Sequence, residues 1–362
     1  MSNPVVTINL VVLNGEKYIR HCLRSIKNQT YSHNQVELNI LDNGSTDRTK
    51  EIIENWKLEV GNSSFASFNF IESRQNLGMW PGQEKLLKYS SGKYVVVLAV
   101  DVILDENFLN NAVVAMEKDE KIGALQPKIY KYDVSHLENE GLPRNIIDTC
   151  GFEIYKSRRI INIGHGERDG GQFNQEKEIF AVEGAVPVFR RDALESCRIM
   201  GQGEGSRGAG IASEIIDHDY FWYGDDLDIA WRMRVFGWKE IYAPSVVAWH
   251  DRQTTKSMKK QWWDYLKRVP IRQAIPIKKR RLEWRNTRFT IIKNDYTINI
   301  LKDLPHILWR EIMILGYTIL FEPGMFLEAP TFLKLLPKII RKRRQIIKRR
   351  VVSPEEMRKW FI

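Results

Sequence analysis

A nearly continuous run of β-branched and other apolar residues, Val5–Leu13, constrains the fold more than any other segment. Such a run is typical of a strand buried on both faces of a sheet that helices cover. Apolar residues then recur at helical spacing over 19–26. The alternation continues, with strands expected at Val36–Leu41, Phe68–Glu72 and Tyr94–Val100 and helices around 52–56 and at Met79–Tyr89. The sequence therefore predicts an α/β fold with a mainly parallel sheet and helices on both faces.

The pattern changes after Asp101. A helix over 106–118 and a strand near 122–127 are followed by a polar stretch, and Ile179–Val182 and Val186–Phe189 have the composition of further strands. We expect these strands to extend the sheet in mixed directions. The chain thus divides into a main domain, 1–252, with halves 1–101 and 102–252, and a C-terminal helical region, 253–362.

Charge is unevenly distributed along the chain. Residues 251–362 contain 27 Lys and Arg against 10 Asp and Glu, whereas residues 1–250 contain 28 against 35. A basic region suits nucleic acid or an anionic membrane. Here large apolar residues between Ile307 and Leu327 accompany the charge, which is more typical of a helix in a lipid interface than of a nucleic-acid reader. We therefore expect helices that bind an anionic membrane surface and no nucleic-acid partner. The alternative is that these helices pack on the rest of the chain or on a second subunit, as in a homo-oligomer.

Two further features bear on the compartment. The longest uncharged run in this region, Ile312–Phe321, has 10 residues, against roughly 20 needed to span a bilayer. Cys22, Cys150 and Cys197 lie far apart and fit neither a disulfide framework nor a zinc site, and the N-terminus shows no signal peptide. We expect a cytoplasmic protein that is peripheral at the inner face of the cell membrane.

Polar residues follow the predicted strands. Asn14, Asp42 and Asp101 each come directly after an apolar strand, and ligands of such sheets bind at the carboxyl ends of the strands. Asp42 lies in an Asx-rich turn, where its ordinary role is to accept from backbone donors. Asp101 needs a partner such as a metal ion, because it ends a strongly apolar strand. His250 ends the apolar strand Val246–Trp249, and together with Asp101 it forms a candidate site for Mg²⁺ or Mn²⁺.

Three carboxylates lie at the start of a predicted helix that begins near Asp225. Capping and the helix dipole would explain one Asp, but adjacent like charges repel, so one or more should have a raised pKa or bind a cation. We interpret Asp225 or Asp226 as a catalytic carboxylate, and we expect Asp228 and Arg232 to pair and fix the helix. The glycine-rich segment Gly201–Gly210 lacks the Gly-Lys-Ser/Thr ending of a phosphate loop, so we expect a mobile loop that orders when ligand binds.

In their order along the chain, these motifs resemble the inverting family-2 glycosyltransferases with a GT-A (Rossmann-like) fold, and most of all the bacterial rhamnosyl- and galactofuranosyl-transferase-like branch. The resemblance covers roughly residues 5–252 and rests on Val11–Ile19, Leu41–Asp47, Asn76–Gly78, Asp101, Asp225–Asp228, Arg232, Gly237–Trp238 and His250. It implies that the nucleotide part of the donor is bound by Asn14, Asp42, Asn43 and Gly44, with Asn76 nearby. It also implies that Asp101 reaches the metal-diphosphate, that His250 is a metal ligand, and that Asp225 or Asp226 is the base.

The expected function follows from this resemblance. It is the transfer of a hexosyl or deoxyhexosyl group, with inversion, from a nucleotide-diphosphate sugar to a glycan or lipid-linked saccharide during cell-surface polysaccharide synthesis. A base removes the proton of the acceptor hydroxyl, and a divalent cation stabilises charge on the departing diphosphate. Two other classes of function stay open. One is a membrane-docked nucleotide-sugar-binding protein without catalysis, and the weaker one is a nucleic-acid-binding protein.

Overall fold

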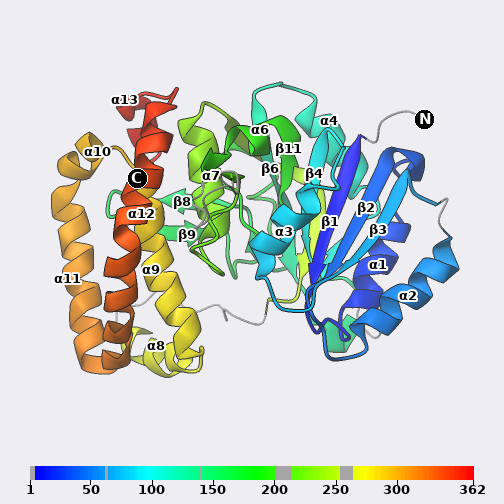
Figure 1. Cartoon of the computed structure of the whole chain (residues 1–362), viewed down its shortest axis with the longest axis horizontal. Helices are drawn as coiled ribbons and strands as arrows, with labels where there is room; N and C mark the ends of the chain where they lie inside the picture. Colours follow the sequence, from blue (N-terminus) through cyan, green and yellow to red (C-terminus); the bar gives the residue numbers. More distant parts are fainter. Residues whose placement is uncertain (1–4, 62–63, 138–140, 201–212, 253–263) are drawn as a thin grey trace, which may run out of the picture.

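The computed structural model describes residues 5–61, 64–137, 141–200, 213–252 and 264–362. A twisted sheet crosses the molecule with helices against it, and the C-terminal helices stand together at one end (Figure 1). The expected α/β fold with a mixed central sheet and a C-terminal helical extension is confirmed. The predicted mobile loop Gly201–Gly210 lies outside the described residues.

The first half consists of strand–helix units. Its strands are parallel and lie in the order β3-β2-β1-β4; they are β1 (Val6–Val12), β2 (Val36–Asp42), β3 (Ser67–Glu72) and β4 (Tyr94–Ala99). The helical segments are α1 (Ile19–Lys27), η1 (His33–Gln35), α2 (Thr49–Val60) and α3 (Met79–Leu87). Every residue of β1 and β2 is buried, which is why these strands are apolar throughout rather than alternating.

The second half extends this sheet. Its elements are β5 (Val102–Leu104), α4 (Phe108–Met116), β6 (Ile122–Lys131), η2 (Val134–His136), β7 (Ile147–Thr149), β8 (Phe152–Ile154), β9 (Ile160–Asn162), β10 (Lys177–Glu178), β11 (Val188–Arg190), α6 (Arg191–Ser196), β12 (Ile199–Met200), β13 (Ser213–Glu214), α7 (Asp225–Val235) and β14 (Lys239–His250). The described sheet has the order β10-β14-β6-β11-β4-β1-β2-β3, with β5 paired to β14 and β7 to β6. Strand β11 is antiparallel to both of its neighbours, so the sheet is mixed as expected.

The prediction of a strand at Ile179–Val182 is wrong. The strand at this place, β10, comes just before it, and within the predicted segment only Ala181 forms an isolated bridge. The side chains are buried in the core beneath α7, but Arg234 of that helix donates to the carbonyl oxygens of Ile179 and Phe180. A short apolar run signals burial, and its periodicity alone does not say whether a ladder forms.

Strand β14 is longer than the predicted Val246–Trp249 and fixes the position of His250. It pairs with β6 in parallel and with β5 in antiparallel, and His250 lies opposite Val102 in this second pairing. Asp101 directly precedes Val102. The two residues that the sequence placed at strand ends are therefore neighbours because β5 returns beside the end of β14.

The C-terminal region consists of helices: α8 (Asp264–Gln273), α9 (Ile277–Asn294), α10 (Thr297–Lys302), α11 (Leu304–Phe321), η3 (Pro323–Glu328), α12 (Ala329–Lys348) and α13 (Pro354–Arg358). Helix α9 contacts α7 and α12, and α12 contacts β12. The fully buried Arg158, which follows β8, donates to Asp295 at 2.7 Å and to Asp303 at 2.8 Å. Part of this region thus packs on the rest of the chain, which is the alternative that the charge pattern left open.

Helix α11 differs from its neighbours because most of its apolar side chains are exposed. It forms the outer edge of the helical group in Figure 1. Trp309 is 67% exposed, and the other exposed apolar residues of the helix are Leu304, Leu308, Ile312, Met313, Leu315, Ile319, Leu320 and Phe321. In the described part of the chain, α11 alone has the length and apolar composition of a membrane span. Its Glu311 pairs with Arg288 of α9, so one side of the helix is tied to the fold.

Candidate active site

The loops after β2 and β3 hold one another through side-chain amides. Asn43 Nδ2 donates to Asn76 Oδ1 at 3.1 Å and to the Gly78 carbonyl at 3.1 Å, and Asn43 Oδ1 accepts from the amide of Leu77 at 2.9 Å. Gly44 has a φ of +89°, and a Cβ there would lie 3.3 Å from backbone of the β3–α3 loop. Only glycine takes this conformation without strain. The Asn43–Gly44 turn and Asn76 therefore form one rigid surface at the end of the sheet.

Asn14 and Asp42 complete this cluster. Asn14 has a φ of +49° and its Oδ1 accepts from the amide of Thr46 at 2.8 Å. Asp42 is buried, and its Oδ1 accepts from the amide of Ser45 at 3.1 Å, which is the ordinary Asx-turn contact. The structure thus brings together Asn14, Asp42, Asn43, Gly44 and Asn76, the five residues expected to bind the nucleotide. They form what we call the donor cluster.

His250 lies between two carboxylates. Its Nδ1 is 2.8 Å from Asp148 Oδ2, and its Nε2 is 3.4 Å from Asp101 Oδ2. Burial alone would lower the pKa of His250, but the charges of Asp101 and Asp148 and its contacts with both raise this pKa to about 10. Burial raises the pKa of Asp148, yet the hydrogen bond from His250 and the charge of Arg252 lower it to about 2. Asp101, His250, Asp148 and Arg252 thus form a continuous row of ion pairs, which we call the histidine row.

The residues of this row have the chemistry of a divalent-cation site in which the substrate supplies the remaining ligands. A His that ligates a metal through one ring nitrogen commonly donates its other N–H to a carboxylate, and Asp148 is placed for that role. In this structure Asp101 Oδ2 and His250 Nε2 pair with one another at 3.4 Å, so a bound cation would replace the proton on Nε2. The described residues contain no group of three or more His, Cys, Asp or Glu side chains that could hold a metal. One carboxylate and one imidazole would leave most ligand positions of Mg²⁺ or Mn²⁺ to water and substrate phosphates.

The adjacent carboxylates at the start of α7 have different surroundings. Asp226 is half-buried, and its oxygens accept from the amides of Gly184 at 3.1 Å and Leu227 at 2.8 Å. Burial and the charge of Glu183 raise its pKa to about 6. Asp225 is buried and neither oxygen has a hydrogen-bond partner in the described structure. Burial, followed by the charge of Asp226, raises the pKa of Asp225 well above its ordinary range. The raised pKa expected for this cluster is thus found at both positions.

Arg252 links this carboxylate pair to the histidine row. Its Nη2 donates to Glu183 at 2.7 Å and its Nε donates to Asp148 at 2.9 Å. Glu183 directly precedes Gly184, the residue that donates to Asp226. Sequence reasoning missed Asp148, Glu183 and Arg252. A signal existed for Asp148, since a lone carboxylate within the apolar segment 146–150 requires a partner.

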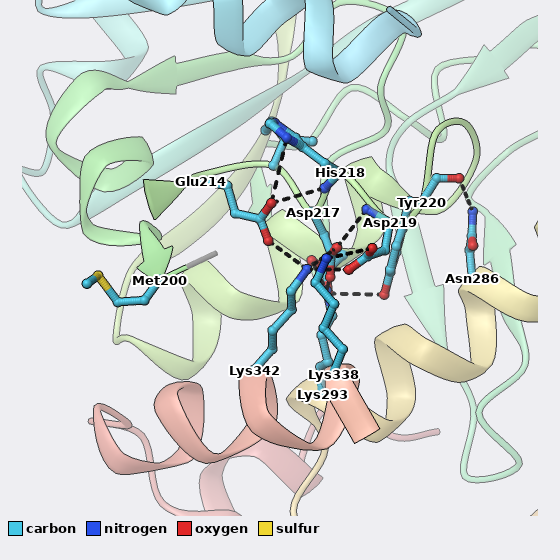
Figure 2. A network of polar contacts seen from close by, with 12 residues as sticks. Met200, Glu214, Asp217, His218, Asp219, Tyr220, Asn286, Lys293, Lys338 and Lys342 are labelled. Carbon is cyan, nitrogen blue, oxygen red and sulfur yellow. Dashed lines mark hydrogen bonds and ion pairs between the residues drawn. The ribbon is translucent and has the colours of Figure 1, made fainter. Parts of the chain in front are cut away.

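A buried network of ion pairs ties segment 214–219, which precedes α7, to the C-terminal helices (Figure 2). Lys293 of α9 donates to Asp217 and, at 2.9 Å, to Asp228 of α7. Lys342 of α12 donates to Asp217 and lies 2.6 Å from Glu214 and 2.7 Å from Asp219. The expected pair of Asp228 and Arg232 is also present. The cations of the C-terminal region therefore neutralise carboxylates around the helix that carries Asp225 and Asp226.

Comparison with known proteins gives partial sequence matches. An uncharacterized glycosyltransferase of Haemophilus influenzae is 30% identical over 122 residues, which are 34% of this chain and 36% of the relative. The beta-monoglucosyldiacylglycerol synthase of Nostoc sp. is 24% identical over 264 residues, 69% of this chain and 48% of the relative. The chain thus matches from about a third to about half of the length of these curated relatives.

Solved structures share the fold at low identity. The mannosyltransferase PcManGT of Pyrobaculum calidifontis, in complex with GDP-Man and Mn²⁺, is 16% identical with a TM-score of 0.50, covering 96% of this chain and 86% of its own. GalNAc-T7 with UDP, GalNAc and Mn²⁺ is 12% identical with a TM-score of 0.56, covering 99% and 56%. These likenesses support the GT-A fold. The family model for glycosyl transferase family 2 matches residues 7–197, more than half of the chain. The chain, with its candidate site at the ends of β1, β2 and β4, therefore belongs to glycosyl transferase family 2.

Proposed function

We propose that the protein is an inverting glycosyltransferase in which Asp226 is the general base. The observation that carries this proposal is the difference between the two carboxylates at the start of α7. Asp226 is half-buried, is oriented by two amides and has a pKa of about 6, whereas Asp225 is buried without a hydrogen-bond partner. A base must reach the acceptor and works best with a pKa near the working pH. Both conditions favour Asp226.

The reaction is a single displacement at the anomeric carbon. The acceptor oxygen forms a bond to that carbon while its proton moves to Asp226, and the bond from the carbon to the diphosphate oxygen breaks. The electron pair leaves with the nucleoside diphosphate, and the configuration inverts. The donor cluster would bind the nucleobase and ribose of the donor. Asp101 and His250 would hold Mg²⁺ or Mn²⁺, which neutralises charge on the diphosphate when bound. Two solved structures of similar fold contain Mn²⁺.

We assign the chain to the rhamnosyl- and galactofuranosyl-transferase-like branch on the motifs of its sequence, with a hexosyl or deoxyhexosyl donor. The acceptor would be a glycan or lipid-linked saccharide in cell-surface polysaccharide synthesis. In support, partial relatives include a beta-monoglucosyldiacylglycerol synthase and a poly-beta-1,6-N-acetyl-D-glucosamine synthase. Residues 1–252 would carry catalysis, with donor binding mainly in 1–101 and acceptor binding mainly in 102–252, and residues 253–362 would attach the protein to its membrane.

The first experiment identifies the donor and tests the base. A panel of nucleotide sugars is screened for protection against thermal unfolding, because a ligand that binds only the folded state raises stability. The selected donor is then assayed for transfer and for hydrolysis. Asp226→Asn should lower turnover by about 10²–10⁴-fold, the usual worth of a general base, with donor protection unchanged. Asp192→Asn, an exposed carboxylate of α6, is the control. Donor protection without any turnover would identify a binding protein without catalysis, and near-wild-type turnover of Asp226→Asn would exclude Asp226 as the base.

The second experiment tests the cation. Turnover should be lost in excess chelator and return with Mg²⁺ or Mn²⁺, and Asp101→Asn and His250→Ala should each raise the metal concentration needed for half-maximal turnover. Asp192→Asn again serves as the control. Full turnover in excess chelator would refute the metal requirement.

The exposed face of α11 supports peripheral attachment to an anionic membrane at the cytoplasmic face. Its apolar side chains face solvent, and exposed cations of the same region include Lys302, Arg341 and Arg344. Each cation near an anionic surface contributes roughly 1 kcal/mol. The basic run of α12 provides fewer such cations than its sequence suggests, because Lys342 is buried among carboxylates. The apolar face should therefore carry most of the binding and should resist salt.

Sedimentation with vesicles tests this attachment. The protein should bind anionic vesicles more than neutral ones and retain part of its binding at high salt. Replacing Trp309 and Leu320 together by Glu should abolish the retained part, whereas Leu58→Glu, at an exposed apolar residue of α2, should not. Equal binding to anionic and neutral vesicles, or none to either, would refute the proposal. A concentration-dependent dimer that the Glu variant disrupts would instead identify the face as a contact between two copies of the chain.

A further inference from the structure

Four consecutive aromatic residues, Tyr220–Tyr223, precede the carboxylates of α7, and the first of them, Tyr220, is buried. Trp222 is 45% exposed and Phe221 is 36% exposed. The rings of Trp222 and Tyr223 lie against each other with centroids 4.5 Å apart. Exposed aromatic rings that are fixed in place offer flat apolar surface with polar edges, which suits ligands that have one apolar face.

The conformation of this loop is held from α9. Phe221 and Tyr223 have φ values of +63° and +69°, a region that is strained for residues other than glycine. Asn286 is fully buried, and its Nδ2 donates to the carbonyls of Trp222 at 2.8 Å and Tyr223 at 2.7 Å. Strained backbone persists where surrounding structure fixes it, and it concentrates at binding sites. The hydrogen bonds from Asn286 therefore hold the aromatic residues in a defined arrangement.

The loop lies between the donor cluster and the proposed base. A Cβ added to Gly78 would come within 2.5 Å of the Phe221 carbonyl oxygen, and Gly78 is bonded to Asn43 of the donor cluster. On its other side the loop continues through Gly224 into α7. In Figure 1 the carboxyl end of β1 and the first turns of α9 lie on the same, lower side of the molecule.

Two lysines of α9 stand over these rings. Lys279 Nζ is 5.3 Å from the ring centroid of Trp222 and 4.4 Å from that of Tyr223, and Lys278 Nζ is 5.2 Å from that of Phe221. Within the described part of the chain, neither lysine has a carboxylate within ion-pair distance, whereas Lys293 and Lys342 of the same region are fully paired. Burial lowers the pKa of Lys279 and the charge of Glu283, one turn along α9, opposes this, so the two positive charges of the aromatic surface are balanced only in part.

We propose that this loop with Lys278 and Lys279 is the acceptor subsite, and that it takes a saccharide bearing an anionic group. One sugar ring stacks on Trp222, the anionic group meets the two lysines, and the attacking hydroxyl points to Asp226. The inference rests on the proposed glycosyl transfer. The anionic group is a phosphate or a uronic carboxylate, because either chemistry pairs with ammonium groups of this kind. The C-terminal helix α9 thereby takes part in choosing the acceptor.

The experiment measures donor hydrolysis and transfer separately with the donor found above. Acceptors are methyl β-D-glucopyranoside, its 6-phosphate and methyl β-D-glucuronide, which share the ring and the methyl group and differ at C6. At least one anionic sugar should be a better acceptor than the neutral one by about 10-fold in kcat/KM. That ratio corresponds to 1.4 kcal/mol between two acceptors. The anionic sugar that gains identifies phosphate or carboxylate as the group recognised.

Variants localise the effect. Trp222→Ala should raise the KM of every acceptor about 10-fold while donor hydrolysis and donor KM stay within about 2-fold. The double variant Lys278→Gln with Lys279→Gln should remove only the preference for charge. Tyr89→Ala and Lys88→Gln are controls at the far end of α3, and Tyr89 is also 45% exposed. Thermal unfolding confirms that each variant is folded.

Three results would overturn the assignment. They are a donor KM that rises with either variant, equal use of charged and neutral acceptors by the wild type, or a Trp222→Ala enzyme that transfers normally. If the wild-type protein neither hydrolyses nor transfers any nucleotide sugar, with or without the acceptors, the proposed function itself fails, whereas transfer without preference for an anionic acceptor overturns only the assignment of the subsite.

Discussion

Replacing Lys293 by Met should destabilise the protein strongly, because its ammonium is fully buried between two carboxylates. Lys293 Nζ contacts Asp217 and Asp228, and the side chains of all three are almost entirely inaccessible to solvent. Removing one partner of a buried ion pair costs about 3–5 kcal/mol. We expect the lower part of that range, because Lys342 still pairs with Asp217 and Arg232 still pairs with Asp228. About 3 kcal/mol is a large fraction of the 5–15 kcal/mol that usually separates folded from unfolded protein.

The pH dependence of this loss follows from the carboxylates. Burial raises the pKa of both, but Lys293 is the largest opposing charge and holds the pKa of Asp217 and of Asp228 below its usual range. A depressed pKa stabilises the fold above the unfolded pKa of about 3.9, and this benefit is lost only as pH falls through the lower folded value. In Lys293→Met burial loses its main opposing charge, so we expect both pKa values to rise above the unfolded value, and the variant then regains stability as pH falls through them. The difference from wild type should therefore be fully present at pH 7.5 and should shrink as pH falls toward 4.

Urea unfolding at several pH values measures the effect as a shift of the midpoint at unchanged slope. Lys302→Met, at an exposed lysine of α10, should stay within about 0.5 kcal/mol of wild type. Adding Asp217→Asn to Lys293→Met restores the balance of charge and should recover part of the loss. The reasoning is refuted if Lys293→Met unfolds at the wild-type midpoint, or if its deficit is the same at pH 4.5 and pH 7.5.

Three other changes test the site. Asp225→Asn should stabilise the protein at pH 7.5 and not at pH 4, because a carboxylate whose pKa is raised in the folded state loses stability as pH rises above the unfolded value; thermal unfolding across this pH range decides it, and a less stable variant at pH 7.5 would contradict it. Asp148→Asn removes the carboxylate that orients His250 and should weaken the apparent affinity for Mn²⁺ in turnover assays about 10–100-fold, with an unchanged metal titration as the opposing result. Asn286→Ala removes the donor that holds the aromatic loop, so amide exchange over 220–224 should accelerate and the acceptor KM should rise while donor hydrolysis persists. Unchanged exchange there would show that the loop does not depend on Asn286.

The sequence by itself determined the strand–helix order and the polar residues at the strand ends. Val5–Leu13 is apolar at nearly every position because β1 is buried on both faces, so local pattern and tertiary position agree. The same agreement identified Asp101, His250 and the Asp225–Asp226 pair as candidates before any geometry was known. Asp228 and Arg232 paired as their helical spacing predicted. The sequence predicts these features because each depends on local periodicity or on a charged residue at the end of an apolar strand or helix.

Only the tertiary structure decided which distant groups meet. Asp148 reaches His250 across 102 positions of sequence, and Lys293 reaches Asp228 across 65. No spacing rule predicts such contacts, because chain folding and not periodicity brings these residues together. The basic region shows the physical reason most clearly. Its lysines look alike in sequence, yet Lys342 is buried among acids while Lys278 stands over an exposed aromatic ring. Burial and the neighbouring charges, which only the folded chain provides, give identical side chains different roles.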